Sequence, residues 1–248
     1  MIIDAHCHIG QGRYKSQTPE QLVRRMEMHG VRASVAVPVE EYMAVDNETG
    51  NDYILAAVRK YEGKLFGFAV ANPWYGGRAG QIADNCLKEG LCGLKFNPTV
   101  QGFKINDELV YPLIEVAEKH GVPVYFHTGT PVTSIPFQLY DLANRYKKVQ
   151  FIMGHCGYSD FWNDVPYIAE NSENIWFDTS LSLTSRTEDI INTRSSCRVL
   201  FGSDSPHSNI GYELSKVMGV KAGDDVKAGI LGGNLARLLG IPGERGLL

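Results

Sequence analysis

The segment MIIDAHCHIG, residues 1–10, places two histidines one residue apart just after a short apolar run. The run is rich in β-branched residues, which is typical of a buried strand. Side chains along a strand alternate between its faces, so His6 and His8 share a face and Cys7 points away. Two neutral imidazoles side by side can bind a divalent cation such as zinc. A catalytic zinc needs about three protein ligands, so the remaining ligands must come from elsewhere in the chain.

The length and composition favour one domain over residues 1–248. A chain of 248 residues has the usual size of a single (β/α)₈ barrel, and 44% hydrophobic residues can build a sizeable core. The net charge is −4, the calculated isoelectric point is about 6.0, and no block of like charge occurs. These features argue against a nucleic-acid or membrane partner. The sequence also shows no signal peptide and no apolar run long enough to span a membrane, so a cytoplasmic protein is expected.

The cysteine pattern supports the same location. The five cysteines form no CxxC motif and number an odd count, which favours free thiols in a reducing compartment over disulfides. They are Cys7, Cys86, Cys92, Cys156 and Cys197.

Strand-like apolar runs alternate with helical stretches along the whole chain, which predicts βαβ units and a parallel sheet. The predicted strands are Met1–Ala5, Arg32–Pro38, Leu65–Ala71, Cys92–Phe96, Val122–His127, Val149–His155, Ile175–Asp178 and Arg198–Ser203. The predicted helices are Pro19–His29, Asn51–Tyr61, Gly80–Glu89, Asp107–His120, Phe137–Tyr146, Phe161–Asn171, Thr187–Thr193 and Asp224–Leu239. Thr18 is the expected N-cap of the first helix, and Gly232-Gly233 are expected to interrupt the last one. The segment 97–106 is predicted as a loop.

Eight such units predict the α/β class and a closed (β/α)₈ TIM barrel. An open, doubly wound sheet is the alternative. No GxGxxG or GxxxxGK motif follows any strand, which weakens a nucleotide-binding interpretation.

The seven histidines fall into two groups. His29 and His120 each end a predicted helix before a glycine, where a cation faces the negative helix end, so a structural role is expected. The others lie at or just past the carboxyl ends of strands, as does Asp204. This second group comprises His6, His8, His127, His155 and His207.

In a (β/α)₈ barrel the carboxyl ends of the strands meet at one mouth, where the active site is built. Histidine or aspartate at four such ends is hard to explain by packing alone. The pattern therefore predicts a metal site.

The motifs DAHCHIG, VYFHTG, FIMGHCG and FGSDSPH resemble those of the amidohydrolase superfamily. GLKFNP, GHCG, GSDSPH and NLARLLGI resemble its amidohydrolase-related branch, which contains metal-dependent hydrolases and decarboxylases of the aminocarboxymuconate-semialdehyde type. The resemblance spans nearly the whole chain. It implies that His6, His8, His127 and Asp204 bind one divalent ion, with zinc as the expected metal, and that His155 acts off the metal as acid or base.

Elementary chemistry agrees with these implied roles. A bound cation lowers the pKa of its water from about 15.7 towards 7. Asp204 can ligate, accept that proton and return it, and His155 can hydrogen-bond the water or a substrate carbonyl. Asp4 is expected to support the ligands from behind.

Lys95 lies near the end of the fourth predicted strand, where binuclear members of the superfamily carry a carboxylated lysine. If Lys95 were carboxylated, His127 and His155 would bind a second metal. The alternative is an unmodified lysine that lines the mouth.

Arg13, Lys95 and His207 are the candidate substrate-binding residues, and Arg186 is a further candidate for a substrate carboxylate. The loops around the predicted mouth are short, so we expect a small-molecule substrate or a site completed by a neighbouring subunit, such as in a homodimer.

The motif leaves several functions open. The first is hydrolysis of a small amide, lactone or ester, and the second is non-oxidative decarboxylation of a small carboxylic acid at the same metal. A TatD-like metal-dependent deoxyribonuclease is less favoured, because that relative carries glutamate where Lys95 stands and because the chain is acidic. A non-catalytic barrel is disfavoured because all ligand positions are kept.

Overall fold

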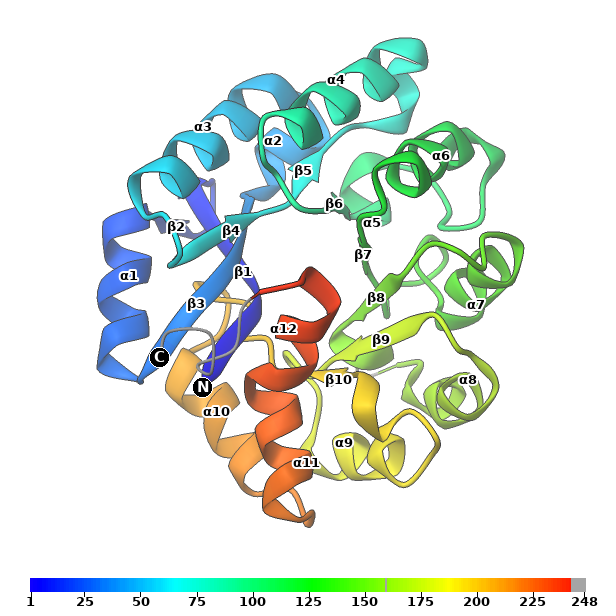
Figure 1. Cartoon of the computed structure of the whole chain (residues 1–248). Helices are drawn as coiled ribbons and strands as arrows, with labels where there is room; N and C mark the ends of the chain where they lie inside the picture. Colours follow the sequence, from blue (N-terminus) through cyan, green and yellow to red (C-terminus); the bar gives the residue numbers. More distant parts are fainter. Residues whose placement is uncertain (159, 242–248) are drawn as a thin grey trace.

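The computed structural model describes residues 1–158 and 160–241, and it has the predicted barrel architecture. Eight strand positions surround a central axis and helices cover their outer side (Figure 1). The regular strand pairs form two sheets with the orders β2-β1-β3-β4 and β10-β9-β8-β7-β6-β5. All pairs are parallel except β1 with β2, a short hairpin at the mouth.

The strands have the following bounds: β1 Ile2–Gln11, β2 Ser16–Gln17, β3 Val31–Pro38, β4 Leu65–Gly67, β5 Ala69–Val70, β6 Leu94–Phe96, β7 Val124–His127, β8 Phe151–Gly154, β9 Ile175–Asp178 and β10 Val199–Leu200.

Backbone hydrogen bonds connect the two sheets on both sides. Phe68, between β4 and β5, donates its N–H to Ala36 of β3 at 3.2 Å, so these two short strands form one barrel position. On the other side, Ala5 of β1 donates to Phe201 at 2.8 Å, and Asp204 donates to His6 at 2.8 Å. The segment after β10 therefore lies beside β1, and these hydrogen bonds join the last strand position of the barrel to the first.

The helices have the following bounds: α1 Pro19–Met28, α2 Glu40–Ala44, α3 Asn47–Lys60, α4 Gly77–Lys88, α5 Pro98–Gln101, α6 Tyr111–His120, α7 Pro136–Arg145, α8 Val165–Asn171, α9 Thr184–Ile191, α10 Ile210–Met218, α11 Asp224–Ala228 and α12 Asn234–Leu239.

Two apolar clusters follow from the alternation of side chains along the strands. The outer cluster lies between strands and helices and includes Ala36, Val124 and Phe126. The inner cluster lies inside the barrel and includes Val35, Ile152 and Leu235. Leu235 belongs to α12, which lies across the end of the barrel where the N-terminus is found (Figure 1). Apolar side chains thus fill the barrel at the end covered by α12, and the polar residues lie at the opposite end, where the strands have their carboxyl ends.

The structure differs from the sequence predictions mainly in element bounds. The strand predicted over Met1–Ala5 extends to Gln11, because β3 pairs with it as far as Pro38 and β2 pairs with its last two residues. The predicted strand Arg198–Ser203 is shorter in its regular part, Val199–Leu200. The predicted helix Thr187–Thr193 begins earlier, at Thr184.

Some elements were not predicted. Helix α10 follows the last strand with Asn209 as its N-cap, and a short helix, α5, occurs in the segment predicted as the loop 97–106. The interruption predicted at Gly232-Gly233 in the helix Asp224–Leu239 is confirmed, and it takes the form of a π-helical turn over Gly229–Gly233. The carbonyl of Ile230 in this turn accepts the N–H of Phe201 at 2.8 Å, so the interruption ties the last helices to the last strand.

Other local predictions are confirmed. Thr18 caps α1 in a capping box with Gln21, and Pro19 is the first helical residue. His29 is the C-cap of α1, and His120 is the last residue of α6 and pairs with Asp84 at 2.8 Å. All five cysteines are free thiols.

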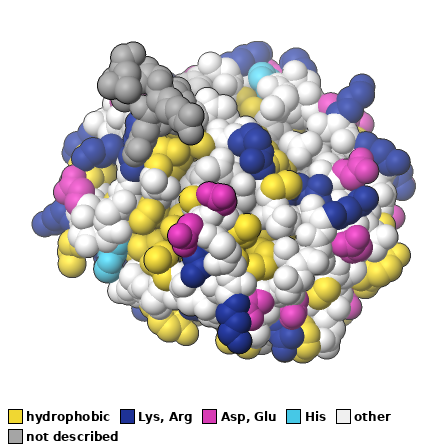
Figure 2. Space-filling model, turned by 60° about the horizontal axis from the view of Figure 1, so that its bottom comes forward, with side chains coloured by type: hydrophobic (Ala, Val, Ile, Leu, Met, Phe, Trp, Pro, Cys, Tyr) yellow, Lys and Arg dark blue, Asp and Glu magenta, His cyan; other side chains and the backbone are white. Residues whose placement is uncertain are grey.

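The surface carries both signs of charge. On the side drawn in Figure 2, acidic and basic side chains are interspersed, in agreement with the absence of like-charge blocks in the sequence. None of the helices in residues 1–158 and 160–241 is long and apolar enough to cross a membrane.

Close packing at Gly93 gives a test of the barrel core. A Cβ on Gly93 would lie 2.5 Å from the ring of Phe68, which is fully buried. We expect Gly93→Ala to lower the free energy of unfolding by about 1–3 kcal/mol, because the ring must move within a packed core. Urea denaturation measures this change.

Gly80→Ala is the matched control. Gly80 lies inside α4, and a Cβ there meets no atom within 4 Å. This substitution should raise the free energy of unfolding by about 0.4–1 kcal/mol, because alanine restricts the unfolded chain. Equal effects of the two substitutions would contradict the described packing.

Candidate metal centre

The carboxyl ends of the strands bring the polar side chains together in one cavity of about 310 Å³. His6 and His8 come from β1, Lys95 from β6 and His127 from β7. The residues that line the cavity are His6, His8, Glu40, Lys95, Asn97, His127, Thr130, His155, Tyr158, Leu181, Asp204 and His207. Every histidine that the sequence placed at a strand end therefore faces the same space.

His6, His8 and Asp204 form one compact group of potential metal donors, since all three are buried and their donor atoms lie within 4.8 Å of one another. His6, His155 and Asp178 form a second buried group by the same criterion. His8 Nε2 lies 3.3 Å and His6 Nδ1 3.5 Å from Asp204 Oδ1. Cys7, between the two histidines, points to the outer side, where its thiol donates to the carbonyl of Val35 at 3.3 Å. The alternation predicted for this strand is thus present despite a register shift between Asp4 and Cys7.

His127 stands to one side of this group. Its ring centroid is 4.8 Å from that of His155, and its Nε2 lies 3.1 Å from Thr130 Oγ1. It lines the same cavity, but among the described residues it belongs to none of the compact donor groups.

Neighbouring groups orient the two imidazoles of β1. His8 Nδ1 lies 3.1 Å from the carbonyl oxygen of Pro38 and therefore donates to it, which leaves Nε2 free to act as a ligand. The hydroxyl of Tyr125 lies 2.8 Å from His6 Nδ1 and donates its proton to Asp178. His6 Nδ1 then donates to the Tyr125 oxygen, which leaves Nε2 as the ligand atom.

Burial keeps the donors in the forms that bind metal. It lowers the pKa of His6 and of His127 well below the ordinary range, so both imidazoles are neutral. Burial opposes ionisation of Asp204, but the neighbouring imidazoles of His8 and His155 hold its pKa below its usual value. Neutral imidazoles and an ionised carboxylate form a donor set that fits a divalent cation.

Lys95 is buried and lies 3.0 Å from His6 Nε2, with its ammonium group 3.7 Å from the centre of the Tyr125 ring. Burial lowers the pKa of Lys95 to about 7, although Asp204 and Asp178 act in the opposite direction. A lysine in this place approaches the nitrogen that a cation would use, and it loses its charge more readily than an exposed lysine.

The sequence reasoning missed a second layer formed by Tyr125, Asp178 and Ser180. Ser180 Oγ donates to Asp178 at 2.7 Å and lies 2.9 Å from His155 Nδ1. The alternation of VYFH places Tyr125 on the face of His127, and Asp178 ends a predicted strand, so both signals were present in the sequence. Gly202 leaves room for this layer, since a Cβ there would collide with Asp178.

Asp4 supports the ligands from behind, as expected. Its carboxylate accepts hydrogen bonds from the N–H of His6 at 3.1 Å, the N–H of Ser203 at 2.8 Å and the hydroxyl of Ser203 at 2.5 Å. Burial raises the pKa of Asp4 to about 7 in spite of these bonds. The residue ties β1 to the segment that carries Asp204.

Several non-glycine residues around the cavity have left-handed backbone conformations. They include His155 (φ 63°), Tyr158 (φ 51°), Leu181 (φ 59°) and Asp204 (φ 50°), which all line the cavity. Such conformations cost about 1–3 kcal/mol each and persist only where the surrounding structure enforces them, commonly at functional sites.

The three candidate substrate-binding residues lie in different places. His207 lines the cavity and its Nε2 pairs with Glu40 at 2.9 Å, and Lys95 lies deep in it. Arg13 is exposed, with its guanidinium 5.4 Å from the centre of the Tyr14 ring, and it does not line the cavity. The structure thus gives the proposed role of Arg13 no geometric support.

Removing the hydroxyl of Tyr125 tests the second layer. In metal-free protein, we expect Tyr125→Phe to lower the free energy of unfolding by about 1–3 kcal/mol, because buried Asp178 loses a donor. Urea denaturation measures the change.

Tyr167→Phe is the control, since Tyr167 is 56% exposed on α8. It should change the unfolding free energy by less than about 0.5 kcal/mol. If Tyr125→Phe were equally neutral, the hydroxyl would contribute nothing to the layer.

Comparison with solved structures supports the barrel. The chain is similar to 5-carboxyvanillate decarboxylase from Sphingomonas paucimobilis (15% identity, TM-score 0.76, covering 97% of this chain and 99% of the other). It is also similar to a manganese-bound dihydroxybenzoic acid decarboxylase from a Polaromonas species (18%, 0.79, 99% and 98%). A third similar structure is 4-oxalomesaconate hydratase from Rhodopseudomonas palustris (17%, 0.72, 97% and 96%).

No curated protein matches the sequence. The family comparison is more specific than the structural ones, because identities of this size show the fold alone. The family model described as "Amidohydrolase" matches residues 3–241, which include every residue of the cavity and all the strands except Ile2, the first residue of β1. The chain therefore belongs to the amidohydrolase family, whose members are enzymes.

Proposed function

We propose that the protein is a metal-dependent enzyme that removes carbon dioxide from a small carboxylic acid without oxidation. The observation that carries the proposal is the buried group of His6, His8 and Asp204 at the mouth of the barrel. His127, in the same cavity, would complete the ligand set, and zinc suits these imidazole and carboxylate donors. A divalent cation bound there would polarise an oxygen of the substrate or acidify water.

Two side chains of the cavity would move protons. In decarboxylation the bond to the carboxyl carbon breaks, its electron pair stays on the remaining carbon, and that carbon must receive a proton. Asp204 and His155 both face the cavity and can deliver and recover such a proton. Ser180, which lies 2.9 Å from His155 Nδ1, orients the imidazole for this role.

We favour decarboxylation because several solved structures that resemble this chain over nearly their whole length are decarboxylases of hydroxylated aromatic acids. Hydrolysis of a small amide, lactone or ester is the second candidate, favoured by the description of the matching family. The same ligands and the same proton carriers would serve both reactions.

Substrate contacts would come from the rim of the cavity. His207, held by Glu40, and Lys95 are the proposed partners of a substrate anion. A neighbouring cavity of about 370 Å³ shares Tyr158 and Leu181 with the metal centre and is lined by Trp162 and Arg186. It offers space for a larger apolar part of the substrate.

Further proposals concern the substrate, the partners, the location and the assembly of the protein. We propose that the substrate is a small molecule, that the protein has no nucleic-acid or membrane partner, that it lies in the cytoplasm and that it forms a homodimer. A second metal bridged by carboxylated Lys95 is kept as an alternative to the mononuclear site.

Metal content tests the ligand set. Protein purified without chelators should hold close to one divalent ion per chain, and His8→Ala and Asp204→Asn should lose most of it, because each removes a donor from the compact group. Elemental analysis measures this content. His120→Gln, a substitution on the outer surface, should retain the metal.

Lys95→Met separates the two metal schemes. In a mononuclear site the content stays near one ion per chain, whereas a bridged pair would start near two and lose one. Unchanged metal in both His8→Ala and Asp204→Asn would contradict the proposed site.

The reaction is tested with a panel of hydroxylated benzoic acids and small lactones, by measuring carbon dioxide release and ring opening separately. We expect carbon dioxide release, and we expect His155→Gln to lower kcat by about 10²- to 10⁴-fold while it keeps the metal, since a proton carrier is lost. Ring opening without carbon dioxide release would favour the hydrolase instead.

A further inference from the structure

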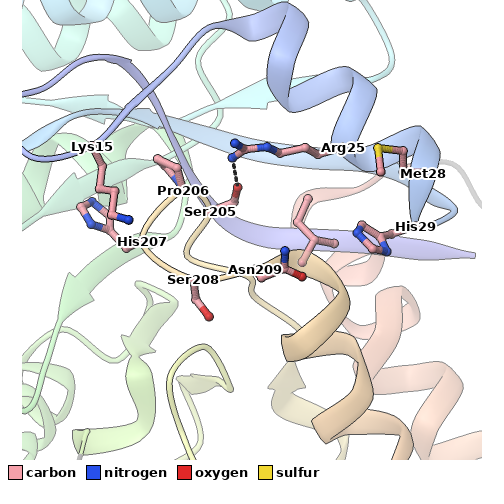
Figure 3. Close-up of a pocket in the computed structure, with 10 residues that line it drawn as sticks. Lys15, Arg25, Met28, His29, Ser205, Pro206, His207, Ser208 and Asn209 are labelled. Carbon is pink, nitrogen blue, oxygen red and sulfur yellow. Dashed lines mark hydrogen bonds between the residues drawn. The ribbon is translucent and has the colours of Figure 1, made fainter.

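A second polar cleft lies outside the barrel mouth, between α1 and the beginning of α10. It has a volume of about 470 Å³, within the range of small-molecule sites. Figure 3 shows Lys15 and His207 at one end, Arg25, Met28 and His29 at the other, and Ser205 and Asn209 between them. Pro206, Ser208 and Ile210 complete the lining.

The lining of this cleft is cationic, and none of the described residues that form it is acidic. Lys15, Arg25 and His29 form no ion pair within residues 1–158 and 160–241, although many other lysines and arginines of the chain do. The hydrogen bonds of Arg25 go to neutral partners, namely Gln17 Oε1 at 2.5 Å and Ser205 Oγ at 3.4 Å. The unpaired charges of Lys15 and Arg25 thus face one hollow of a protein whose net charge is −4.

The cleft also receives the amino end of α10. Asn209 is the N-cap of this nine-residue helix and uses its side chain to accept the N–H of Tyr212 at 3.1 Å. Asn209 and Ile210 lie in the wall, so the positive end of the helix dipole faces the cleft. The helix adds to a field that the cationic side chains already create.

The cleft and the metal cavity are separate spaces with one lining residue in common, His207. The Nε2 of His207 is held on the cavity side by Glu40. The floor of the cleft is Ser205, the residue after Asp204, and its carbonyl accepts the N–H of His8 at 2.7 Å. A ligand in the cleft would lie behind the segment that carries the proposed metal ligand.

We propose that this cleft is a binding site for a small organic anion that carries a phosphate or carboxylate group. Lys15 at one end of the cleft and Arg25 at the other each offer a charge-assisted hydrogen bond to an anionic ligand. Met28 and Ile210 provide apolar contact for the rest of the molecule. The site is independent of the reaction proposed for the metal centre.

Calorimetric titration tests the site, with the metal-loaded protein in a buffer free of phosphate and carboxylates. Inorganic phosphate and succinate serve as separate probes, and the tighter one identifies the preferred anionic group. We expect saturable binding of at least one, and we expect Lys15→Gln and Arg25→Gln each to weaken it by about tenfold, as for the loss of a hydrogen bond to a charged group.

Arg24→Gln is the matched control, because it makes the same charge change on the same helix at an exposed residue outside the cleft. Its affinity should equal that of the wild type. Circular dichroism of every variant shows whether the fold is intact. If Arg25→Gln does not fold, Lys15→Gln decides, since the Lys15 side chain has no hydrogen bond within the described residues to lose.

Two results would overturn the proposal. One is the absence of saturable binding of either anion by the wild type. The other is an equal loss of affinity in Arg24→Gln, which would assign the binding to the general charge of α1 instead of the cleft.

Discussion

The backbone pairing between β1 and the segment that follows β10 is the contact on which the candidate centre depends. The N–H of Asp204 donates to the carbonyl of His6, and the N–H of His8 donates to the carbonyl of Ser205. These bonds set the register between the first and last strand positions of the barrel. Since one residue of slip would turn each side chain to the other face, the register decides that Asp204 meets His6 and His8.

Burying the carboxylates of Asp4 and Asp178 costs free energy, and hydrogen bonds offset this cost. Asp4 accepts three hydrogen bonds, and Asp178 accepts from Tyr125 and Ser180. A buried carboxylate without donors would be expensive, whereas one that is fully hydrogen-bonded can help to hold a unique arrangement. The inner apolar cluster, closed by α12 at the opposite end, supports the polar layer from below.

The loop after β10 links the two hollows described here. On its inner side it carries Asp204, and on its outer side Ser205 and Pro206 line the cationic cleft. Because Asp204 and Ser205 are adjacent in the chain, a single short segment lines both the metal cavity and the cleft. This is typical of barrels, in which the loops at the carboxyl ends of the strands carry function on a rigid scaffold.

The sequence by itself determined the barrel, because strand and helix patterns repeat eight times and both depend on local periodicity. It also determined that His6 and His8 share a face, since side chains alternate along a strand, and that further histidines and Asp204 lie at strand ends. Only the tertiary structure decided that Tyr125 and Asp178 support His6, that Arg13 stays outside the cavity, and that Lys15, Arg25 and His29 gather in a second cleft. The physical reason is that these contacts join residues far apart in the chain, such as Asp4 and Ser203 at a separation of 199. Such distances are set by the closure and register of the barrel, which no local pattern encodes.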